Sequence, residues 1–257
     1  MICAGIDAGS RTIKVVLLEA ETARVLAAGL VDQGTQQDAL ACQLFDRLLA
    51  ESGLDRRDVG RTVATGYARN IVSAADTTIT EITCHARGVR QLVPDALTVV
   101  DIGGQDSKLL RLRPDGGVRD FSMNDRCAAG TGCFLEVVAK RLDVDLAGLG
   151  EMASRSRSPA PISSMCVVFA ETEIIGLLAS GARPEDIVAG VQAAIAARVA
   201  AMAGRKITPP VIFTGGVAMI PGMSAALSVT LGSSVSVAPD PQMTGALGAA
   251  LLAAEEP

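Results

Sequence analysis

The chain has 257 residues, of which 49% are apolar and 20% charged, so it can bury a sizeable core and has the composition of an ordered globular protein. Its net charge of -5 and its aromatic content of 2% exclude a basic or base-stacking interface for nucleic acid. No basic segment followed by an apolar one opens the chain, and no apolar run reaches the roughly 18 residues of a membrane-spanning helix. We therefore expect a cytoplasmic protein of two lobes, with no nucleic-acid partner and no membrane.

The first part of the chain predicts a βββαβ arrangement followed by a helix. Short apolar or alternating runs predict strands at 2–6, 12–18, 25–31 and 61–65. Leu40, Leu44 and Leu48 recur every four residues and predict an amphipathic helix over 36–52. A second helix is predicted over 80–92. We take residues 1–94 as the N-terminal lobe, ending at Pro94.

Residues 95–257 are predicted to form the C-terminal lobe. It begins with a strand at 97–102 and a second β run at 108–113. Helices are expected at 131–142, 169–180 and 184–203, before a strand at 211–214. The Ala-rich stretch 188–203 carries Gln192 and Arg198, which favours a buried helix over a membrane span. The last helix, 244–254, is expected to pack back on the N-terminal lobe.

Two strands end in the same kind of turn. Asp7-Ala8-Gly9-Ser10 follows the first strand, and Asp101-Ile102-Gly103-Gly104-Gln105 follows the strand at 97–102, which indicates an internal duplication. A third glycine turn, Gly215-Gly216, follows the strand at 211–214. Backbone amides can hold a phosphate only where no side chain blocks the approach, so three such turns in order predict a nucleotide site. The alternative is that they are ordinary hairpin turns with aspartates at the strand ends.

The turns suggest a division of roles around a bound nucleotide. Asp7 and Asp101 would together hold a hydrated Mg²⁺, which prefers one or two carboxylates plus water and phosphate oxygens. Gln105 would orient the attacking water. Gly215 and Gly216 would let the adenosine lie against the backbone. The residues expected to meet the phosphates are Ser10, Arg11, Thr12, Lys14, Gly103 and Gly104.

Six cysteines at irregular spacing do not form a secreted disulfide framework. Cys127 and Cys166 stand where polar loops of small residues open predicted helices, and a helix N-terminus stabilises negative charge. Both are therefore candidate metal ligands. A cubane iron–sulfur cluster takes four thiolates, which a symmetric dimer would supply. The alternative is two buried thiols. The remaining cysteines fall on apolar positions and are expected to be structural: Cys3, Cys42, Cys84 and Cys133.

The order of the three turns resembles that of the actin-like, sugar kinase and heat-shock chaperone ATPase superfamily. This resemblance implies a duplicated α/β fold with a nucleotide cleft between its two lobes. Within the superfamily, several motifs resemble the activators of 2-hydroxyacyl-CoA dehydratases and the related ATPase subunits of benzoyl-CoA reductase. These motifs are Asp7-Ala8-Gly9-Ser10, Ala64-Thr65-Gly66-Tyr67-Ala68-Arg69-Asn70, Asp101-Ile102-Gly103-Gly104-Gln105-Asp106, Asn124-Asp125-Arg126-Cys127-Ala128-Ala129-Gly130-Thr131-Gly132, Phe169-Ala170-Glu171 and Thr214-Gly215-Gly216-Val217-Ala218.

The resemblance implies a homodimer with one 4Fe-4S cluster on its two-fold axis, bound by Cys127 and Cys166 of each chain. Binding and hydrolysis of ATP would change the angle between the cluster-bearing helices and drive a low-potential electron to a dehydratase or reductase. Reduced ferredoxin or flavodoxin would be the donor, and a heterodimer with a related ATPase subunit is the alternative assembly. The resemblance also adds Ile13, Val217 and Gln242 to the nucleotide contacts. Met219 stands where the family often has a polar residue.

Two other function classes compete with the electron-transferring ATPase. A small-molecule kinase of the same superfamily would need an acceptor pocket and a carboxylate base, for which Asp106 or Asp125 could serve. A nucleotide-dependent switch without catalytic output is the third. Neither alternative requires the two cysteines. The single histidine, His85, could act as a general base, but we favour a hydrogen-bonded residue at a lobe interface.

Overall fold

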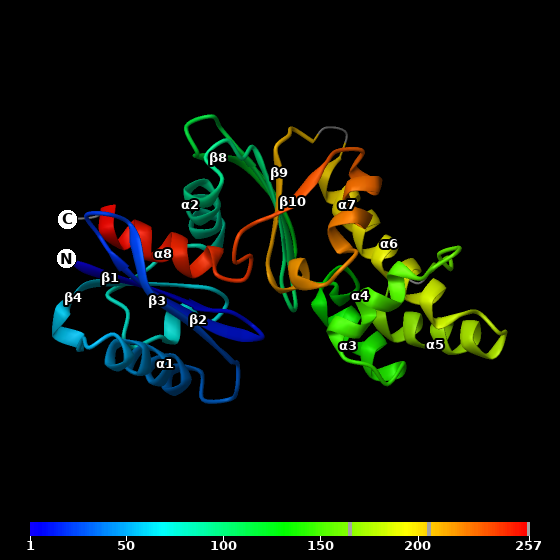
Figure 1. Cartoon of the computed structure of the whole chain (residues 1–257), viewed down its shortest axis with the longest axis horizontal. Coiled ribbons are helices and arrows are strands. Elements are labelled where there is room, and N and C mark those ends of the chain that lie inside the picture. Colours follow the sequence, from blue (N-terminus) through cyan, green and yellow to red (C-terminus); the bar gives the residue numbers. More distant parts are fainter. Residues whose placement is uncertain (164–165, 205–206, 256–257) are drawn as a thin grey trace. The chain divides into compact units, whose positions relative to one another are not determined.

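The chain divides into two compact units. The computed structural model describes residues 1–163, 166–204 and 207–255, so Ser164 and Met165 of the motif before Cys166 lie outside the described residues. The first unit comprises Met1–Ala96, Leu112–Arg119 and Gln242–Pro257, and the second comprises Leu97–Arg111 and Asp120–Pro241. Figure 1 shows the elements of each unit along the chain.

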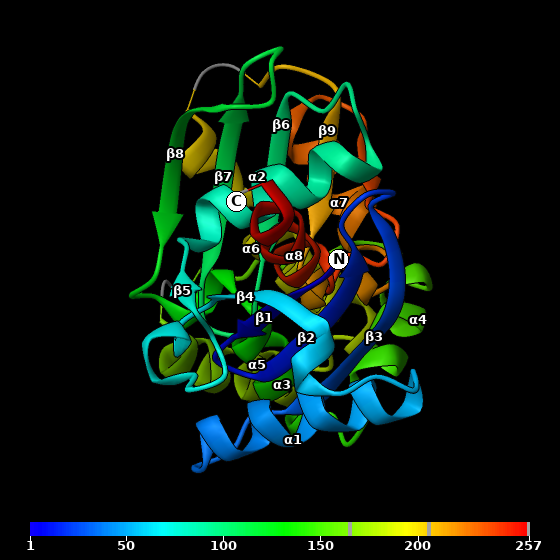
Figure 2. The ribbon, with the colours of Figure 1, turned by 90° about the vertical axis from the view of Figure 1, so that its left-hand side faces the viewer.

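The first unit is a five-stranded sheet between helices. Its strands are β1 (Ile2–Ala8), β2 (Thr12–Glu19), β3 (Arg24–Asp32), β4 (Val59–Thr65) and β5 (Thr77–Thr78), in the order β3-β2-β1-β4-β5. Strand β1 pairs antiparallel with β2 and parallel with β4. Figure 2 shows α1 (Gln37–Glu51) on one face, and α2 (Glu81–Leu92) and α8 (Thr244–Glu255) on the other.

The alternation of β2 explains why this sheet carries helices on both faces. Ile13, Val15 and Leu17 are buried in the cluster that includes α1, whereas Val16 and Leu18 are buried against α8. Successive side chains of a strand point to opposite faces, so the consecutive apolar residues 15–18 of β2 need a cover on each side of the sheet.

Helix α8 approaches α2 and β1 so closely that only glycine fits at the crossings. A Cβ on Gly248 would lie 1.7 Å from the Cys84 carbonyl oxygen, and a Cβ on Gly88 would lie 2.0 Å from the Thr244 carbonyl oxygen. A Cβ on Gly5 of β1 would lie 2.0 Å from the carbonyl oxygen of Ala246. Backbone therefore packs on backbone along α8.

The second unit repeats the sheet of the first. Its strands are β6 (Thr98–Ile102), β7 (Ser107–Leu112), β8 (Val118–Asn124), β9 (Val211–Thr214) and β10 (Val235–Val237), in the order β10-β9-β6-β7-β8. Strand β6 pairs antiparallel with β7 and parallel with β9, as β1 does with β2 and β4. This correspondence confirms the predicted internal duplication.

Helices of the second unit cover one face of its sheet, as Figure 1 shows. Val100, Ile102 and Phe213 from the strands are fully buried in a cluster with Phe134 and Ile195 from the helices. The helices are α3 (Gly132–Arg141), α4 (Leu146–Ser154), α5 (Val167–Ala179), α6 (Pro184–Ala203) and α7 (Met223–Leu231). Short 3-10 turns complete the chain at Arg56–Asp58, Arg69–Ile71, Ala128–Gly130 and Gly216–Met219.

Helix α6 belongs to the core of the second unit. Among the described residues it is the one helix long and apolar enough to cross a membrane by length and composition, and half of its apolar window is buried. Val188, Val191 and Ile195 are fully buried in the cluster of this unit. The burial of these side chains accounts for its apolar composition.

The predicted strands and helices are confirmed with ends that differ by at most a few residues, and several further elements appear. Helix α4 was not predicted because Gly148 and Gly150 lower its helix propensity. Helix α7 begins at the left-handed residue Gly222 with no side-chain cap, so its start carries no sequence signal. Strand β8 contains Arg119 and Asp120, which are exposed and obscure its pattern. Strands β5 and β10 are too short to show a period.

Candidate functional site

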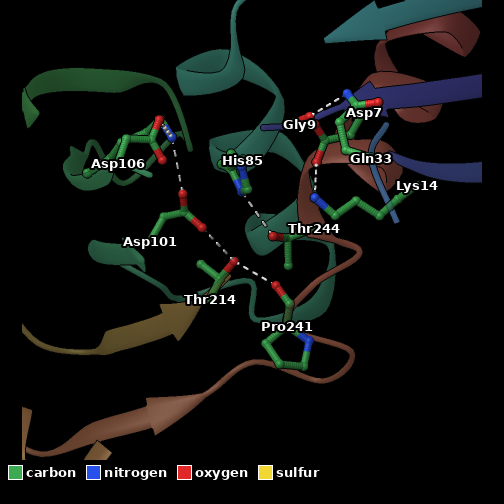
Figure 3. A network of polar contacts seen from close by, with 11 residues as sticks. Asp7, Gly9, Lys14, Gln33, His85, Asp101, Asp106, Thr214, Pro241 and Thr244 are labelled. Atoms are coloured by element: carbon green, nitrogen blue, oxygen red, sulfur yellow. Dashed lines mark hydrogen bonds and ion pairs between the residues drawn. The ribbon is translucent and has the colours of Figure 1, made fainter. Parts of the chain in front are cut away.

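The turn Asp7-Ala8-Gly9-Ser10, named the first phosphate turn because the sequence predicts phosphate binding there, begins at the carboxyl end of β1 with a buried aspartate. Asp7 is 5% exposed, and its Oδ2 lies 3.2 Å from Nζ of Lys14, its partner in the antiparallel register (Figure 3). On the other side, Thr65 of β4 is in register with Asp7. Gly66 follows with φ +94°, and a Cβ there would lie 2.5 Å from Asp7 Oδ1. Glycine is therefore required beside this carboxylate.

The second unit holds the same arrangement around Asp101, which is 3% exposed. Nζ of Lys108, its antiparallel partner, lies 3.4 Å from Asp101 Oδ2. Thr214 of β9 is in register with Asp101 and precedes Gly215, whose φ is +90°. A Cβ on Gly215 would lie 2.8 Å from Asp101 Oδ1. Each unit thus carries a buried Asp–Lys pair beside a Thr-Gly step.

Lys108 and Gly66 were not identified from the sequence as members of these two Asp–Lys arrangements. The signal was present, because seven positions separate Asp7 from Lys14 and also Asp101 from Lys108. In an antiparallel hairpin with turns of equal length, equal spacing places both lysines opposite their aspartates.

The main chain of the first turn is folded so that carbonyl oxygens face Gln33. Its Nε2 donates to the Gly9 carbonyl at 2.8 Å, as Figure 3 shows, and its amide donates to the Arg11 carbonyl at 2.9 Å. The Gly9 amide closes the turn by donating to the Thr12 carbonyl at 3.1 Å. In a planar trans peptide the N–H points opposite to the C=O. The Ser10 amide is therefore directed away from Gln33, as an amide that binds phosphate must be.

The second turn uses the start of α3 in place of a glutamine. The Gly132 amide donates to the Gly103 carbonyl, and the Cys133 amide to the Gly104 carbonyl, both at 2.9 Å. The amides of Gly104 and Gln105, in the same peptide planes as those carbonyls, point away from α3. In the first turn the backbone N–H group therefore points away from Gln33, and in the second turn the N–H groups point away from the start of α3.

The third turn is tied to the segment that leads to Gln242. The Thr214 hydroxyl donates to the Pro241 carbonyl at 2.9 Å, as Figure 3 shows. The Gly215 amide donates to the same carbonyl at 2.9 Å. Gly216 opens a 3-10 turn in which Val217 is 2% exposed, so its side chain belongs to the core. Met219 is 59% exposed.

The residues predicted to contact the nucleotide differ in the exposure of their side chains. The side chains of Arg11 and Gln105 are exposed, and Ser10 and Thr12 are partly buried. Ile13 is fully buried in the core of the first unit, which leaves only its main chain for any contact.

His85 is a buried residue of the first unit. It is 6% exposed, and its Nδ1 lies 3.0 Å from the Thr244 hydroxyl at the start of α8 (Figure 3). A Cβ on Gly245 would lie 3.1 Å from Asp7 Oδ2 and 3.2 Å from His85 Nε2. The expected hydrogen bond is present, and it joins α2 to α8 beside the first phosphate turn.

Cys127 and Cys166 are cysteines of the second unit that form no disulfide, each at the N-cap of a helical segment. Cys166 is exposed and caps the 13-residue α5. Cys127 is partly buried and caps the single 3-10 turn Ala128–Gly130, whereas α3 itself begins at Gly132. Cys127 thus precedes α3, as predicted for a helix over 131–142, and the extended residue Thr131 separates the 3-10 turn from the helix.

The other cysteines have different surroundings. Cys3 and Cys84 are fully buried, and burial raises the pKa of Cys84 to about 12. Cys42 is only partly buried, with Sγ 3.7 Å from Asp38 Oδ1 and 3.6 Å from the Ser73 hydroxyl. Cys133 is also partly buried. Of the four cysteines expected to be structural, Cys3 and Cys84 are fully buried, and Cys42 and Cys133 are partly buried.

The fold and the paired turns define a class of protein, the actin-like ATPases and sugar kinases. Solved structures that share this fold include a ROK hexokinase from Thermus thermophilus, which has a TM-score of 0.52 at 16% identity and covers 98% of each chain. A likeness at this identity concerns the fold alone.

Nearer relatives identify the family. A family model described as the BadF/BadG/BcrA/BcrD ATPase family matches residues 4–253, and the chain belongs to this family. It is 46% identical to the activator of lactoyl-CoA dehydratase from Anaerotignum propionicum over 99% of this chain and 98% of the relative. It is 31% identical to one subunit of the benzoyl-CoA reductase from Thauera aromatica, over 97% and 92%. The solved activator of 2-hydroxyisocaproyl-CoA dehydratase from Clostridium difficile, with bound ADPNP, has a TM-score of 0.93 at 41% identity and covers 99% of this chain and 95% of that one.

Proposed function

We propose that the chain is an ATPase that works as a dimer, binds one 4Fe-4S cluster between two copies and delivers a low-potential electron to a 2-hydroxyacyl-CoA dehydratase. The observation that carries the proposal is the presence, in one unit, of the glycine turn 103–105 and of two cysteines at the starts of helical segments. The 46% identity to a dehydratase activator supports this acceptor over a benzoyl-CoA reductase, for which the identity is 31%.

The proposed nucleotide site uses main-chain amides for phosphate and carboxylates for Mg²⁺. The amides of Ser10, Gly104 and Gln105 would donate to phosphate oxygens. Asp7 and Asp101 offer the oxygen ligands that Mg²⁺ prefers, partly through water. Each faces a lysine ammonium at 3.2 Å or 3.4 Å, and a lysine beside a magnesium–phosphate group can pair with the phosphate instead. The donor set therefore fits a magnesium nucleotide.

Hydrolysis would require one oriented water. We assign this role to Gln105, whose exposed side chain follows the second turn directly. The water oxygen forms a bond to the γ-phosphorus while the bond from that phosphorus to the bridging oxygen breaks. ADP and phosphate leave, and the water proton passes to phosphate or solvent. The chain would position the reactants and neutralise charge.

The cysteine pair fits half of a cluster site. Among the described residues, no group of three or more Cys, His, Asp or Glu side chains could hold a metal ion within one chain. Cys127 and Cys166 of two copies would give the four thiolates of a cubane cluster. When bound, the cluster would supply a one-electron carrier. The N-terminal amides of α5 favour negative charge at Cys166.

The surface around Cys166 supports a dimer. The outer face of α5, formed by Val168, Phe169, Thr172 and Ile175, is exposed and uncharged, with Phe169 at 69% and Val168 at 68% exposure. An apolar face of this kind marks an interaction surface. We propose that the α5 faces of two copies meet beside the cluster. Reduced ferredoxin or flavodoxin would supply the electron, and oxygen would destroy so exposed a cluster.

The proposal is tested by purifying the full chain without oxygen. We expect a brown dimer with about four irons, as a cubane cluster shared by two chains requires. Cys127→Ser and Cys166→Ser should each remove colour and iron while leaving ATP binding unchanged. Cys42→Ser is the control, because Cys42 is a partly buried thiol of the other unit and should keep the iron. A colourless, iron-free preparation that still binds ATP would disprove the electron-transfer function.

A further inference from the structure

The second phosphate turn is bonded directly to the helix that follows Cys127. The amides of Gly132 and Cys133 donate to the carbonyls of Gly103 and Gly104 at 2.9 Å. These are among the first N–H groups of α3, which have no partner within their own helix. A Cβ on Gly132 would lie 3.2 Å from the Gly103 carbonyl oxygen. No side chain separates the turn from α3, so a shift of one displaces the other.

Cys127 is held firmly at the same end of α3. The Asn124 side chain accepts from the Cys127 amide at 3.1 Å and donates to the Cys127 carbonyl at 2.8 Å. The Thr131 hydroxyl, fully buried, donates to the Ala128 carbonyl at 2.7 Å. The segment from Asn124 to Gly132 is therefore one compact turn between the strand β8 and α3.

The far end of α3 reaches the helix of the other cysteine. Nη2 of Arg141, the last residue of α3, donates to Oε1 of Glu171 in α5. Only two side chains of α5, Ala170 and Ile174, are buried, and both lie in the cluster that contains Phe134 and Leu135 of α3. Val167, Leu177 and Leu178 of α5 also pack, partly buried, against this cluster. Apolar contacts have no preferred direction, whereas an ion pair is directional and adds a constraint on the rotation and slide of α5.

We infer that Arg141 and Glu171 are positioning residues that keep α5, and with it Cys166, in register with α3. The nucleotide state of the second phosphate turn then reaches Cys127 through the main chain of α3 and Cys166 through this ion pair. The inference rests on the proposed function. The pair is 42% and 37% exposed, and exposed pairs add little to stability, so its role lies in geometry and its loss should leave the fold intact.

The test is amide hydrogen exchange of the full chain, measured with Mg²⁺ and ADP or a non-hydrolysable ATP analogue, and without nucleotide. In the unaltered chain, nucleotide should change the exchange of two segments, residues 127–133 and residues 166–172. In Arg141→Met and in Glu171→Gln, the response of 127–133 should persist and that of 166–172 should be lost. The charge-exchanged double variant, Arg141→Glu with Glu171→Arg, should regain the second response.

Matched controls distinguish the loss of the Arg141–Glu171 ion pair from the loss of any nearby charged side chain. Lys140→Met removes the neighbouring exposed cation of α3, and Glu151→Gln removes an exposed carboxylate of α4. In each of these two variants, nucleotide should still change the exchange of residues 127–133 and of residues 166–172. The inference is overturned if Arg141→Met and Glu171→Gln retain the 166–172 response, or if the unaltered chain shows none on binding nucleotide. Iron content and nucleotide affinity of the unaltered chain decide the proposed function separately.

Discussion

At the scale of single residues, the buried Asp–Lys pair of each unit depends on a neighbouring glycine that no other residue can replace. Gly66 and Gly215 combine a positive φ with a Cβ position that overlaps the neighbouring aspartate or its strand. Both follow a threonine that is in register with that aspartate. The two constraints are independent, because a left-handed φ penalises any side chain, whereas the overlap penalises only one that cannot move.

We predict that Gly66→Ala and Gly215→Ala each lower the free energy of unfolding by about 3 kcal/mol or more, from backbone strain and steric overlap together. Nucleotide affinity should fall as well, because the aspartate is displaced. Chemical denaturation and equilibrium nucleotide binding measure the two effects.

Gly53→Ala and Gly232→Ala are the matched controls for the first and second units. Both positions have positive φ, +69° and +62°, with nothing within 4 Å of an added Cβ. They should lose about 1 kcal/mol from the left-handed backbone alone and bind nucleotide normally. Equal losses at all four positions would contradict the role given to the overlap.

Lys108 is a buried cation that faces the buried carboxylate of Asp101. The side chains of Lys108 and Asp101 are 3% and 4% exposed. Lys108→Met should lower the free energy of unfolding by about 3–5 kcal/mol, because it leaves a buried carboxylate without this cation. Adding Asp101→Asn should recover part of the loss in thermal denaturation. Lys108 also pairs with Asp106 at 2.6 Å, so a double variant as unstable as the single one would show that the pair with Asp101 is not the source of the loss.

The reactivity of the Cys84 thiol reports whether α2 is buried. Because burial raises the pKa of Cys84 to about 12, its thiolate is scarce at pH 8, and thiolate is the reactive form. Iodoacetamide at pH 8 should therefore leave Cys84 unmodified in the native protein and modify it after denaturation. Peptide mass spectrometry gives the answer. The exposed Cys166, in protein depleted of iron, is the positive control and should react within the same time.

At the scale of elements, α8 links the first phosphate turn to α2 without intervening side chains. Gly248→Ala should separate the two helices, because its Cβ would lie 1.7 Å from the Cys84 carbonyl oxygen. We expect weaker nucleotide binding and a loss of about 3 kcal/mol in unfolding free energy, since backbone cannot yield as a side chain does. The Gly53→Ala control should retain nucleotide binding. Unchanged affinity in Gly248→Ala would show that α8 does not position the turn.

The start of α6 gives a pH dependence. Asp186 accepts from the Ser156 hydroxyl and from the amides of Arg157 and Ser158, and these bonds lower its pKa. Its contribution to stability is present above the unfolded pKa of about 3.9 and is lost as pH falls through the lower folded value. Asp186→Asn should thus destabilise the protein at pH 7 and less so at acid pH. An equal effect at both pH values would contradict this linkage.

At the scale of the whole molecule, the proposed dimer depends on the α5 face. Phe169→Asp introduces a charge where an apolar side chain is 69% exposed, and should convert the dimer to a monomer with little change in thermal stability. Val229→Asp, at an 83% exposed position in α7, is the control and should remain dimeric. Analytical ultracentrifugation measures the difference. A dimeric Phe169→Asp would place the interface elsewhere.

The sequence by itself determined the local features of this protein. Asp7 and Asp101 after apolar strands, the glycine turns and the duplication were readable because the requirement for a small residue at a turn is a property of a few adjacent positions. The sequence marks Cys127 and Cys166 as candidate ligands because each precedes a helical run, and Cys127 also stands among polar and small residues. The fold class followed from the order of these features along the chain.

Tertiary structure decided which distant residues support them. The pairing of Thr65 with Asp7 and of Thr214 with Asp101 follows from strand register, which a local pattern does not fix. The bonds from α3 to the second phosphate turn and the Arg141–Glu171 pair join segments about thirty residues apart, which only the tertiary fold brings together. The resemblance implied a nucleotide contact for Ile13, but its position on β2 directs its side chain into the core.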